Sequence, residues 1–303
     1  MASRLLQLKN VRHHAGASFI ADVDIDGDSM ENPAASLVRL FENGLEIGPA
    51  HSPHADIENA GSGRFCHWYK QLYFSSSDAT SPLKSDYTYT ALVEESSRTA
   101  IQKPTFLALQ SGVLRYPYKD VWCCKSPIDM ALYQMLIWRE KPRTILELGT
   151  LEGGSALWFA DLFRAYNIDG HVYSLDIVSN SKVKDPLVTF HQGDVLDLKR
   201  SWPLEWIKRL PRPILAIEDS GHQFEMSAAV IAYMAEALRP GEYLVVEDGI
   251  ATPMGEDAQF NGGPLRAIDE FLKSRSEFTI DREFCDFFGR NVTWSVDGFL
   301  RRT

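Results

Sequence analysis

Long apolar stretches are missing from this sequence of 303 residues. No segment approaches the roughly 20 consecutive apolar residues with which a helix crosses a bilayer. Residues 1–9 also lack the apolar run and the cleavage site of a secretory signal. We therefore expect a cytoplasmic protein without a membrane span.

Cysteine is scarce, and positive charge is in deficit. The four cysteines are Cys66, Cys123, Cys124 and Cys285, and no two of them form a CxxC pair. This spacing supports neither a disulfide framework nor a zinc site, so we expect reduced cysteines that serve packing. The 31 basic residues stand against 41 acidic residues, which gives a net charge of −10. That balance argues against a nucleic acid or an anionic membrane surface as the main partner.

The order of predicted elements divides the chain near residue 118. Residues 1–118 are irregular and rich in Ser, Gly, His and aromatic residues, and we interpret them as a smaller accessory region, β-rich or irregular. Residues 119–303 alternate predicted strands with helices, which is typical of βαβ units. The sequence therefore predicts an α/β fold with a Rossmann-like, mostly parallel sheet and helices on both faces. The expected strands are 144–148, 172–177, 188–191, 214–217 and 243–246, with a pair at 278–281 and 292–300 along the sheet edge.

A glycine-rich turn joins the strand at 144–148 to the following helix. Glycine permits a tight turn and close approach of a ligand, and the helix amides can hold an anionic group. The spacing is not the G-x-G-x-x-G of a nicotinamide site. It resembles the first motif of class I methyltransferases, in which the acidic residue helps to orient the methionine part of S-adenosylmethionine (SAM). The residues expected to contact this cofactor are Glu147, Gly149, Thr150, Gly153, Gly154 and Ser155.

Two aspartates follow later strands in an order that fits the same cofactor. Asp176 closes the strand at 172–177 and is placed to accept hydrogen bonds from both ribose hydroxyls. Asp194 resembles the residue that meets the adenine amino group. Taken singly, each aspartate would more often cap a loop or a helix. Because both follow the glycine turn in this order, we interpret them as cofactor contacts.

Three further carboxylates follow the two central strands. Asp219 comes after the strand at 214–217, and Glu247 and Asp248 come after the strand at 243–246. The carboxyl ends of parallel strands meet at one edge of a sheet, so these acids should converge and repel one another unless they are neutralised. Mg²⁺ fits this need best, although one acid could instead cap a helix while the others face solvent. We expect a metal set of Asp219, Glu247 and Asp248, with Asp219 also bordering the cofactor.

His222 follows Asp219 closely. Methyl transfer to an alcohol needs an oxygen nucleophile, and an alcohol is nearly un-ionised at neutral pH. A metal bound to the hydroxyl lowers its pKa, and a general base removes its proton during attack. Histidine titrates in the range that suits this base. A lone histidine is usually structural, but its place beside the expected metal ligand favours a catalytic role.

From about Tyr118 to Arg302 the chain resembles the cephalosporin-hydroxylase-like methyltransferase family, which includes metal-dependent sugar O-methyltransferases of macrolide biosynthesis. The resemblance implies Mg²⁺ ligands at the expected metal set and a base at His222. One departure is Gly221, where many relatives carry a different residue. The chain lacks the His-x-Asp…His triad of iron oxygenases, so the hydroxylase label does not describe its chemistry. The segments that carry the resemblance are 125–129, 147–161, 218–222, 243–250, 262–264, 291–294 and 298–302.

We therefore expect a Mg²⁺-dependent O-methyltransferase that moves a methyl group from SAM to a hydroxyl of a sugar-bearing or polyol small molecule, in natural product biosynthesis or glycan modification. A catechol or phenol acceptor stays open, as does a catalytically silent SAM-binding regulatory protein. In the accessory region, Trp68, Tyr69, Tyr73 and Phe74 could stack on a sugar, although a core role is the simpler interpretation. Similar proteins use such extensions for oligomer contacts or as a lid, which implies a homo-oligomer.

Overall fold

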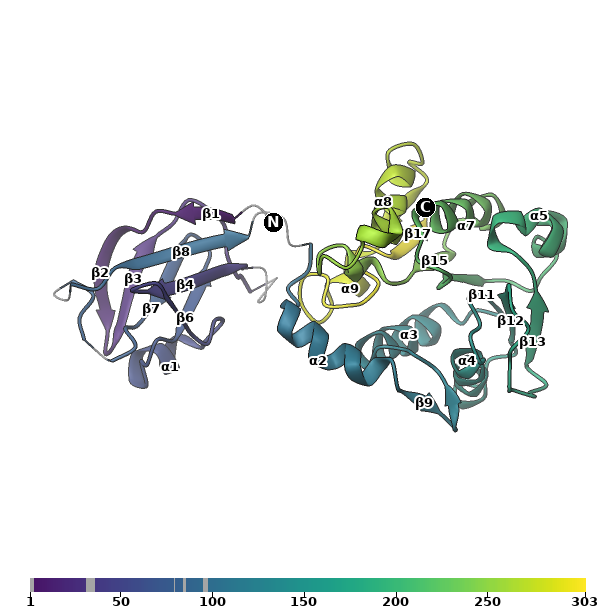
Figure 1. Cartoon of the computed structure of the whole chain (residues 1–303), viewed down its shortest axis with the longest axis horizontal. Coiled ribbons are helices and arrows are strands. Elements are labelled where there is room, and N and C mark those ends of the chain that lie inside the picture. Colours follow the sequence, from purple (N-terminus) through teal and green to yellow (C-terminus); the bar gives the residue numbers. More distant parts are fainter. Residues whose placement is uncertain (1–2, 31–35, 79, 84–85, 95–97) are drawn as a thin grey trace. The chain divides into compact units, whose positions relative to one another are not determined.

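The computed structural model describes residues 3–30, 36–78, 80–83, 86–94 and 98–303. The chain divides into two compact units, Met1–Ala100 and Ile101–Thr303 (Figure 1). Each unit has a hydrophobic core of its own. Within the described residues, no helix combines the length and apolar character needed to span a membrane.

The described part of the first unit is β-rich. Its two four-stranded antiparallel sheets have the strand orders β1-β8-β4-β5 and β2-β3-β7-β6. Side chains from both sheets, including Leu40, Leu72 and Phe74, form the core, whereas Tyr69 is half exposed. The elements are β1 (Ser3–Leu6), β2 (Lys9–Ala15), β3 (Ser18–Asp22), β4 (Val38–Glu42), β5 (Leu45–Ile47), α1 (His54–Asn59), β6 (Phe65–Trp68), β7 (Gln71–Phe74) and β8 (Tyr89–Glu94).

The second unit begins before residue 118, with helix α2 (Lys103–Val113). Phe106 and Val113 of this helix are buried against Ile250 and Trp294. These contacts place α2 in the core of the second unit. The sequence predicts no helix here, because the apolar pattern of the segment is weak, and the helix buries only Phe106 and Val113.

A seven-stranded sheet forms the centre of the second unit, in the order β13-β12-β11-β14-β15-β17-β16. The strands from β13 to β15 are parallel, and β17 pairs antiparallel with both of its neighbours, β15 and β16. The predicted fold class is therefore confirmed. The strands are β11 (Thr144–Leu148), β12 (His171–Asp176), β13 (Val188–Gln192), β14 (Ile214–Glu218), β15 (Tyr243–Val246), β16 (Phe278–Ile280) and β17 (Phe299–Arg302).

Helices cover both faces of this sheet, which explains why its central strands are continuous apolar runs. Ile145 points to the face that packs on α3 and α4, whereas Leu146 points to the face that packs on α7 and α8. Ser126 caps α3 by accepting hydrogen bonds from the amides of Ile128 and Asp129. The remaining elements are β9 (Pro117–Tyr118), β10 (Val121–Trp122), α3 (Pro127–Glu140), α4 (Gly154–Ala165), η1 (Val195–Asp197), α5 (Leu198–Ser201), α6 (Leu204–Ile207), α7 (Phe224–Ala237), η2 (Gly249–Ala251), η3 (Ala258–Phe260), α8 (Gly263–Leu272) and α9 (Arg282–Cys285).

The predicted strand pair at the sheet edge is present, but its second strand is shorter than expected. β17 begins at Phe299, not at residue 292. The preceding segment is held by Asp129, which accepts hydrogen bonds from the Thr293 hydroxyl and from the Trp294 amide at 3.1 Å. The apolar pattern around Trp294 thus reflects burial in a loop and not membership of the sheet.

Candidate active site

A cleft opens beyond the carboxyl ends of β11, β12, β14 and β15. The chain runs outward from β11 to β13 and then continues on the other side of β11 with β14, so the cleft lies where the strand order reverses. Its volume is about 710 Å³, which suits a ligand of cofactor size. The lining residues that the sequence singled out are Gly149, Thr150, Ser155, Asp176, Asp194, Asp219, His222 and Asp248.

Gly149 makes the close approach of β11 and β14 possible. Its φ is +107°, and a Cβ at this position would collide with the carbonyl oxygen of Asp219. The Asp219 amide donates to the carbonyl of Leu148 at 2.8 Å, which fixes the two strand ends together. Glycine is therefore required here by both conformation and space.

Gly153 and Gly154 serve packing and do not line the cleft. A Cβ on Gly153 would lie 2.9 Å from the ring of Phe190, and a Cβ on Gly154 would lie 2.5 Å from the carbonyl oxygen of Trp122. These glycines bring the start of α4 close to its neighbours. The motif predicts that both glycines contact the cofactor, whereas the structure places them in packing contacts outside the lining of the cleft.

Asp176 ties the end of β12 to the glycine turn. Its Oδ2 accepts from the amides of Thr150 at 2.9 Å and Leu151 at 3.1 Å. Asp194 caps η1 by accepting from the amide of Leu196 at 2.9 Å. Both aspartates thus cap loops as the alternative interpretation held, and both also face the cleft.

Glu147 lies behind the glycine turn and not in the cleft. The side chain is fully buried, and its Oε2 accepts from the Ser174 hydroxyl at 2.5 Å. Burial raises the pKa of Glu147 to about 7, against the opposing effect of the Lys125 charge and the Ser155 and Ser174 hydroxyls. The sequence predicts direct contact between Glu147 and the methionine part of the cofactor. The buried position of the side chain outside the cleft does not favour that contact.

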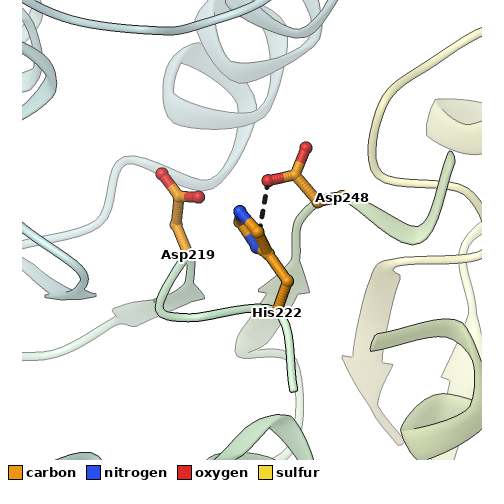
Figure 2. Close-up of side chains that lie close together, drawn as sticks. All are labelled: Asp219, His222 and Asp248. Carbon is orange, nitrogen blue, oxygen red and sulfur yellow. Dashed lines mark ion pairs between the residues drawn. The ribbon is translucent and has the colours of Figure 1, made fainter. Parts of the chain in front are cut away.

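Asp219, His222 and Asp248 converge just beyond the carboxyl ends of the central strands β14 and β15 (Figure 2). One ligand atom from each residue lies within 4.8 Å of those of the other two. His222 Nδ1 is 3.3 Å from Asp248 Oδ2. Ligands that share one divalent ion at about 2.1 Å must lie within roughly 4.2 Å of one another, so a small movement of these side chains would accommodate Mg²⁺. The carboxylate oxygens fit this metal well, and imidazole fits it less well.

Glu247, the third expected metal ligand, lies apart from this group in a buried ion pair. Its Oε1 accepts from Lys125 Nζ at 2.5 Å and from the Tyr133 hydroxyl at 2.6 Å. Lys125 Nζ also donates to Asp219 Oδ2 at 2.5 Å. The Glu247 side chain is 6% exposed, whereas those of Asp219 and Asp248 are 25% and 27% exposed, so the cleft reaches the two aspartates more readily.

Lys125 is a member of this cluster that the sequence does not reveal. Its place in the resembling segment 125–129 indicates no charge partner for it. The available signal was the predicted cluster of three acids, because such a cluster calls for a cation from the chain as well as from solution.

The electrostatics of the cluster reflect burial and mutual charge. Burial raises the pKa of the carboxyls of Asp219, Glu247 and Asp248, while the charge of Lys125 opposes this effect at each of them. Burial would lower the pKa of His222, but the surrounding carboxylates, Asp248 first, outweigh it and raise that pKa. Lys125 behaves in the same way, because Asp219 and Glu247 hold its pKa well above the ordinary value despite burial.

The other side of the cleft is mostly apolar. Phe106 and Leu107 of α2 line it, together with Trp122, Phe260 and Trp294. The Trp294 indole is fixed by donating to Gln110 Oε1 at 2.6 Å. This wall lies outside the part that the cofactor motifs account for, so it provides space for a second ligand.

The model of the family Rhamnosyl O-methyltransferase/CmcI matches residues 113–303. The chain belongs to this family. The resemblance seen in the sequence is thereby confirmed, and the protein is an O-methyltransferase of the Rhamnosyl O-methyltransferase/CmcI family. The matched segment covers most of the second unit and none of the first.

Similar proteins include rhamnosyl O-methyltransferases of mycobacteria. That of Mycobacterium tuberculosis strain H37Rv is 34% identical over 195 residues, which cover 61% of this chain and 77% of the relative. That of Mycobacterium leprae is 31% identical over 201 residues, covering 61% and 82%. Among solved structures, an apo form of CmcI is 26% identical with a TM-score of 0.51, and a Mg-SAM form is 25% identical with the same TM-score. Both cover 63% of this chain and 77% of CmcI.

Proposed function

We propose that this O-methyltransferase moves a methyl group from SAM to a hydroxyl of a sugar-bearing small molecule in a Mg²⁺-dependent reaction. The observation that carries the proposal is the convergence of Asp219, His222 and Asp248 beside the glycine-turn cleft. The family match supports it, as do the rhamnosyl O-methyltransferases among the relatives and the Mg-SAM form of CmcI.

The part of the cleft around the glycine turn would hold SAM. Gly149 lets the cofactor approach the backbone closely, and Thr150 and Ser155 border the same space. Asp176 is already oriented by three amides, those of Thr150 and Leu151 at Oδ2 and that of Val178 at Oδ1. Its Oδ1 retains a lone pair for a ribose hydroxyl. Asp194 lies farther along the cleft, where the adenine amino group would meet it.

Asp219 and Asp248 would hold Mg²⁺ through oxygens that face the cleft. Glu247 would reach the ion only through Oε2, since its Oε1 accepts from Lys125 and Tyr133. A bound Mg²⁺ lowers the pKa of an acceptor hydroxyl and orients it. The chain supplies this site with two half-buried carboxylates at adjacent strand ends.

His222 would act as the general base. Its Nδ1 faces Asp248, so the neutral tautomer with the proton on Nδ1 leaves Nε2 free to take the proton of the acceptor hydroxyl. Phe260 packs edge-on against the imidazole, with ring centroids 5.7 Å apart, and limits its rotation. The apolar wall opposite would exclude water from the reacting groups.

The experiment is a turnover assay with SAM and a panel of rhamnosides, other glycosides and catechols. We expect methylated glycoside as the product, loss of turnover on exhaustive chelation, recovery with Mg²⁺ or Mn²⁺, and poor recovery with Ca²⁺, whose longer bonds misplace the hydroxyl. Methylation of catechols alone would favour the phenol alternative. Absence of turnover with every acceptor, despite tight SAM binding, would favour a regulatory protein.

The first unit has a structural or acceptor-side role in this proposal. The family match leaves it out, and the residues that would hold SAM and metal all lie in the second unit. We infer that it serves as an oligomer contact or as a lid over the acceptor of a cytoplasmic enzyme.

A further inference from the structure

Lys125 is a buried cation between two carboxylates. Its side chain is 1% exposed, and its Nζ lies 2.5 Å from both Asp219 Oδ2 and Glu247 Oε1. The next residue, Ser126, caps α3, so the backbone that carries this lysine is anchored at the start of a helix. The ammonium group therefore has a fixed position that it cannot easily leave.

This position matters because Asp219 belongs to two arrangements at once. Its Oδ2 accepts from Lys125, while Asp219 also offers a ligand atom to the group formed with His222 and Asp248. Each carboxylate has two oxygens, so the lysine occupies one and leaves the other for the cleft. Glu247 is similarly engaged at Oε1 by Lys125 and the Tyr133 hydroxyl.

Two physical effects follow from a lysine at this point. Its charge compensates the carboxylates of Asp219 and Glu247 when no metal is bound, which keeps them from repelling one another and being displaced. The same charge repels any divalent ion that binds on the other side of Asp219, and at separations of a few ångströms inside a protein this repulsion is strong.

We propose that Lys125 is a positioning residue, a built-in cation that holds the acidic cluster in place without metal and weakens its affinity for the divalent ion. The inference rests on the proposed function, since it concerns the same metal site. Lys125 acts through Asp219 and Glu247 and does not line the cleft.

The test is Mn²⁺ binding to the full chain, measured by calorimetry in mildly alkaline buffer, where protons compete least for the carboxylates. In Lys125→Met, which keeps the length of the side chain and removes its charge, we expect Mn²⁺ to bind on the order of tenfold more tightly. Lys125→Gln, neutral but still a hydrogen-bond donor, should show the same direction. Lys182→Met is the matched control, because this exposed lysine pairs with Glu152 at 2.5 Å outside the cluster. The Mn²⁺ affinity of the Lys182→Met protein should equal that of the parent.

Thermal melting adds a second readout. The metal-free Lys125→Met protein should melt below the parent, and Mn²⁺ should raise its melting temperature by more than it raises that of the parent. If Lys125→Met cannot be purified, both measurements on Lys125→Gln carry the test.

Mn²⁺ affinity that is unchanged within about threefold, or weaker, in the neutral variants would overturn the inference, because a merely structural lysine would on removal loosen the site and weaken binding. A parent protein that binds no Mn²⁺ and methylates no acceptor would instead contradict the proposed function.

Discussion

His222 and Asp248 both line the cleft and face each other, with His222 Nδ1 3.3 Å from Asp248 Oδ2. Both residues adopt left-handed backbone conformations, with φ of +60° and +57°. Non-glycine residues rarely adopt this conformation, and such residues cluster at functional sites where the surroundings enforce them. The pair thus has the geometry of a base and its orienting carboxylate, and equally of two metal ligands.

Replacing His222 distinguishes these two roles. If His222 is the base, the His222→Ala protein should lose on the order of 10²–10⁴ in turnover rate and should still bind Mn²⁺ and SAM. Asp248→Asn should weaken Mn²⁺ binding as well as turnover. Kinetics and calorimetry on the same preparations measure both quantities. His171→Ala is the control, because His171 lies at the start of β12, away from the cleft, and should keep full activity. A large loss of Mn²⁺ affinity in His222→Ala would make this histidine a ligand instead.

Asp176→Ala should weaken binding of the demethylated cofactor by about 1.5–3 kcal/mol, the range for hydrogen bonds to a charged group. The variant loses the acceptor for a ribose hydroxyl and also the acceptor that holds the amides of Thr150, Leu151 and Val178. Calorimetry gives the affinity, and melting without ligand reports on the turn. Asp194→Ala is the comparison, since Asp194 holds a single amide at η1. Parent-like affinity in Asp176→Ala would show that the ribose lies elsewhere.

Much of the fold could be predicted because its signals are local. Each central strand is a short apolar run, and each cleft acid ends a strand or lies within two residues of its end, as Asp219 follows β14 and Asp248 is the second residue after β15. Strand direction alone then brings these acids to one edge. The predicted positions of the cleft aspartates needed no knowledge of side-chain packing.

The missed features depend on contacts between distant parts of the chain. Lys125 is 94 positions before Asp219 and 122 before Glu247, so no local pattern reveals their ion pairs. Helix α2 acquires its place by packing on distant residues such as Ile250 and Trp294, and Gln110 accepts a hydrogen bond from the Trp294 indole across 184 positions. The motif assigns Glu147 to the cofactor, whereas its side chain is buried with the rest of β11, whose two faces are both covered by helices.

Glu147 should make stability depend on pH. Its folded-state pKa is about 7, raised chiefly by burial from the ordinary 4.5, so folding favours the protonated form. The resulting stabilisation is complete below about pH 4.5 and is lost as the pH rises through about 7. Glu147→Gln mimics the protonated form at every pH. The parent therefore loses stability as the pH rises, and the variant does not. The unfolding free energy of the variant minus that of the parent should be larger at pH 8 than at pH 5 by about 1–3 kcal/mol.

Denaturant unfolding at both pH values measures this gain. Glu205→Gln is the control, because Glu205 is 78% exposed and its replacement should shift stability equally at the two values. A pH-independent difference between Glu147→Gln and the parent would show that Glu147 is ionised in the folded protein throughout.

The final prediction concerns the boundary between the units. A protein of residues 101–303 keeps the whole core of the second unit, so it should fold and bind the demethylated cofactor like the parent. Removing residues 1–113 also deletes α2 and uncovers Trp294 and Ile250, so this shorter protein should melt at a lower temperature or fail to fold. Melting and calorimetry compare the two. Similar stability of both would show that α2 contributes little to the core.

Two single variants of the full chain separate packing from acceptor contact within α2. Phe106→Ala should lower the unfolding free energy by about 3–5 kcal/mol, because Phe106 is buried against Trp294. Leu107 lines the cleft and is 51% exposed, so Leu107→Ala should leave stability nearly unchanged and raise the KM for the acceptor alone.

Acceptor turnover by residues 101–303 then decides the role of the first unit. Loss of turnover with intact cofactor binding indicates an acceptor platform or lid, whereas parent-like turnover excludes the first unit from catalysis.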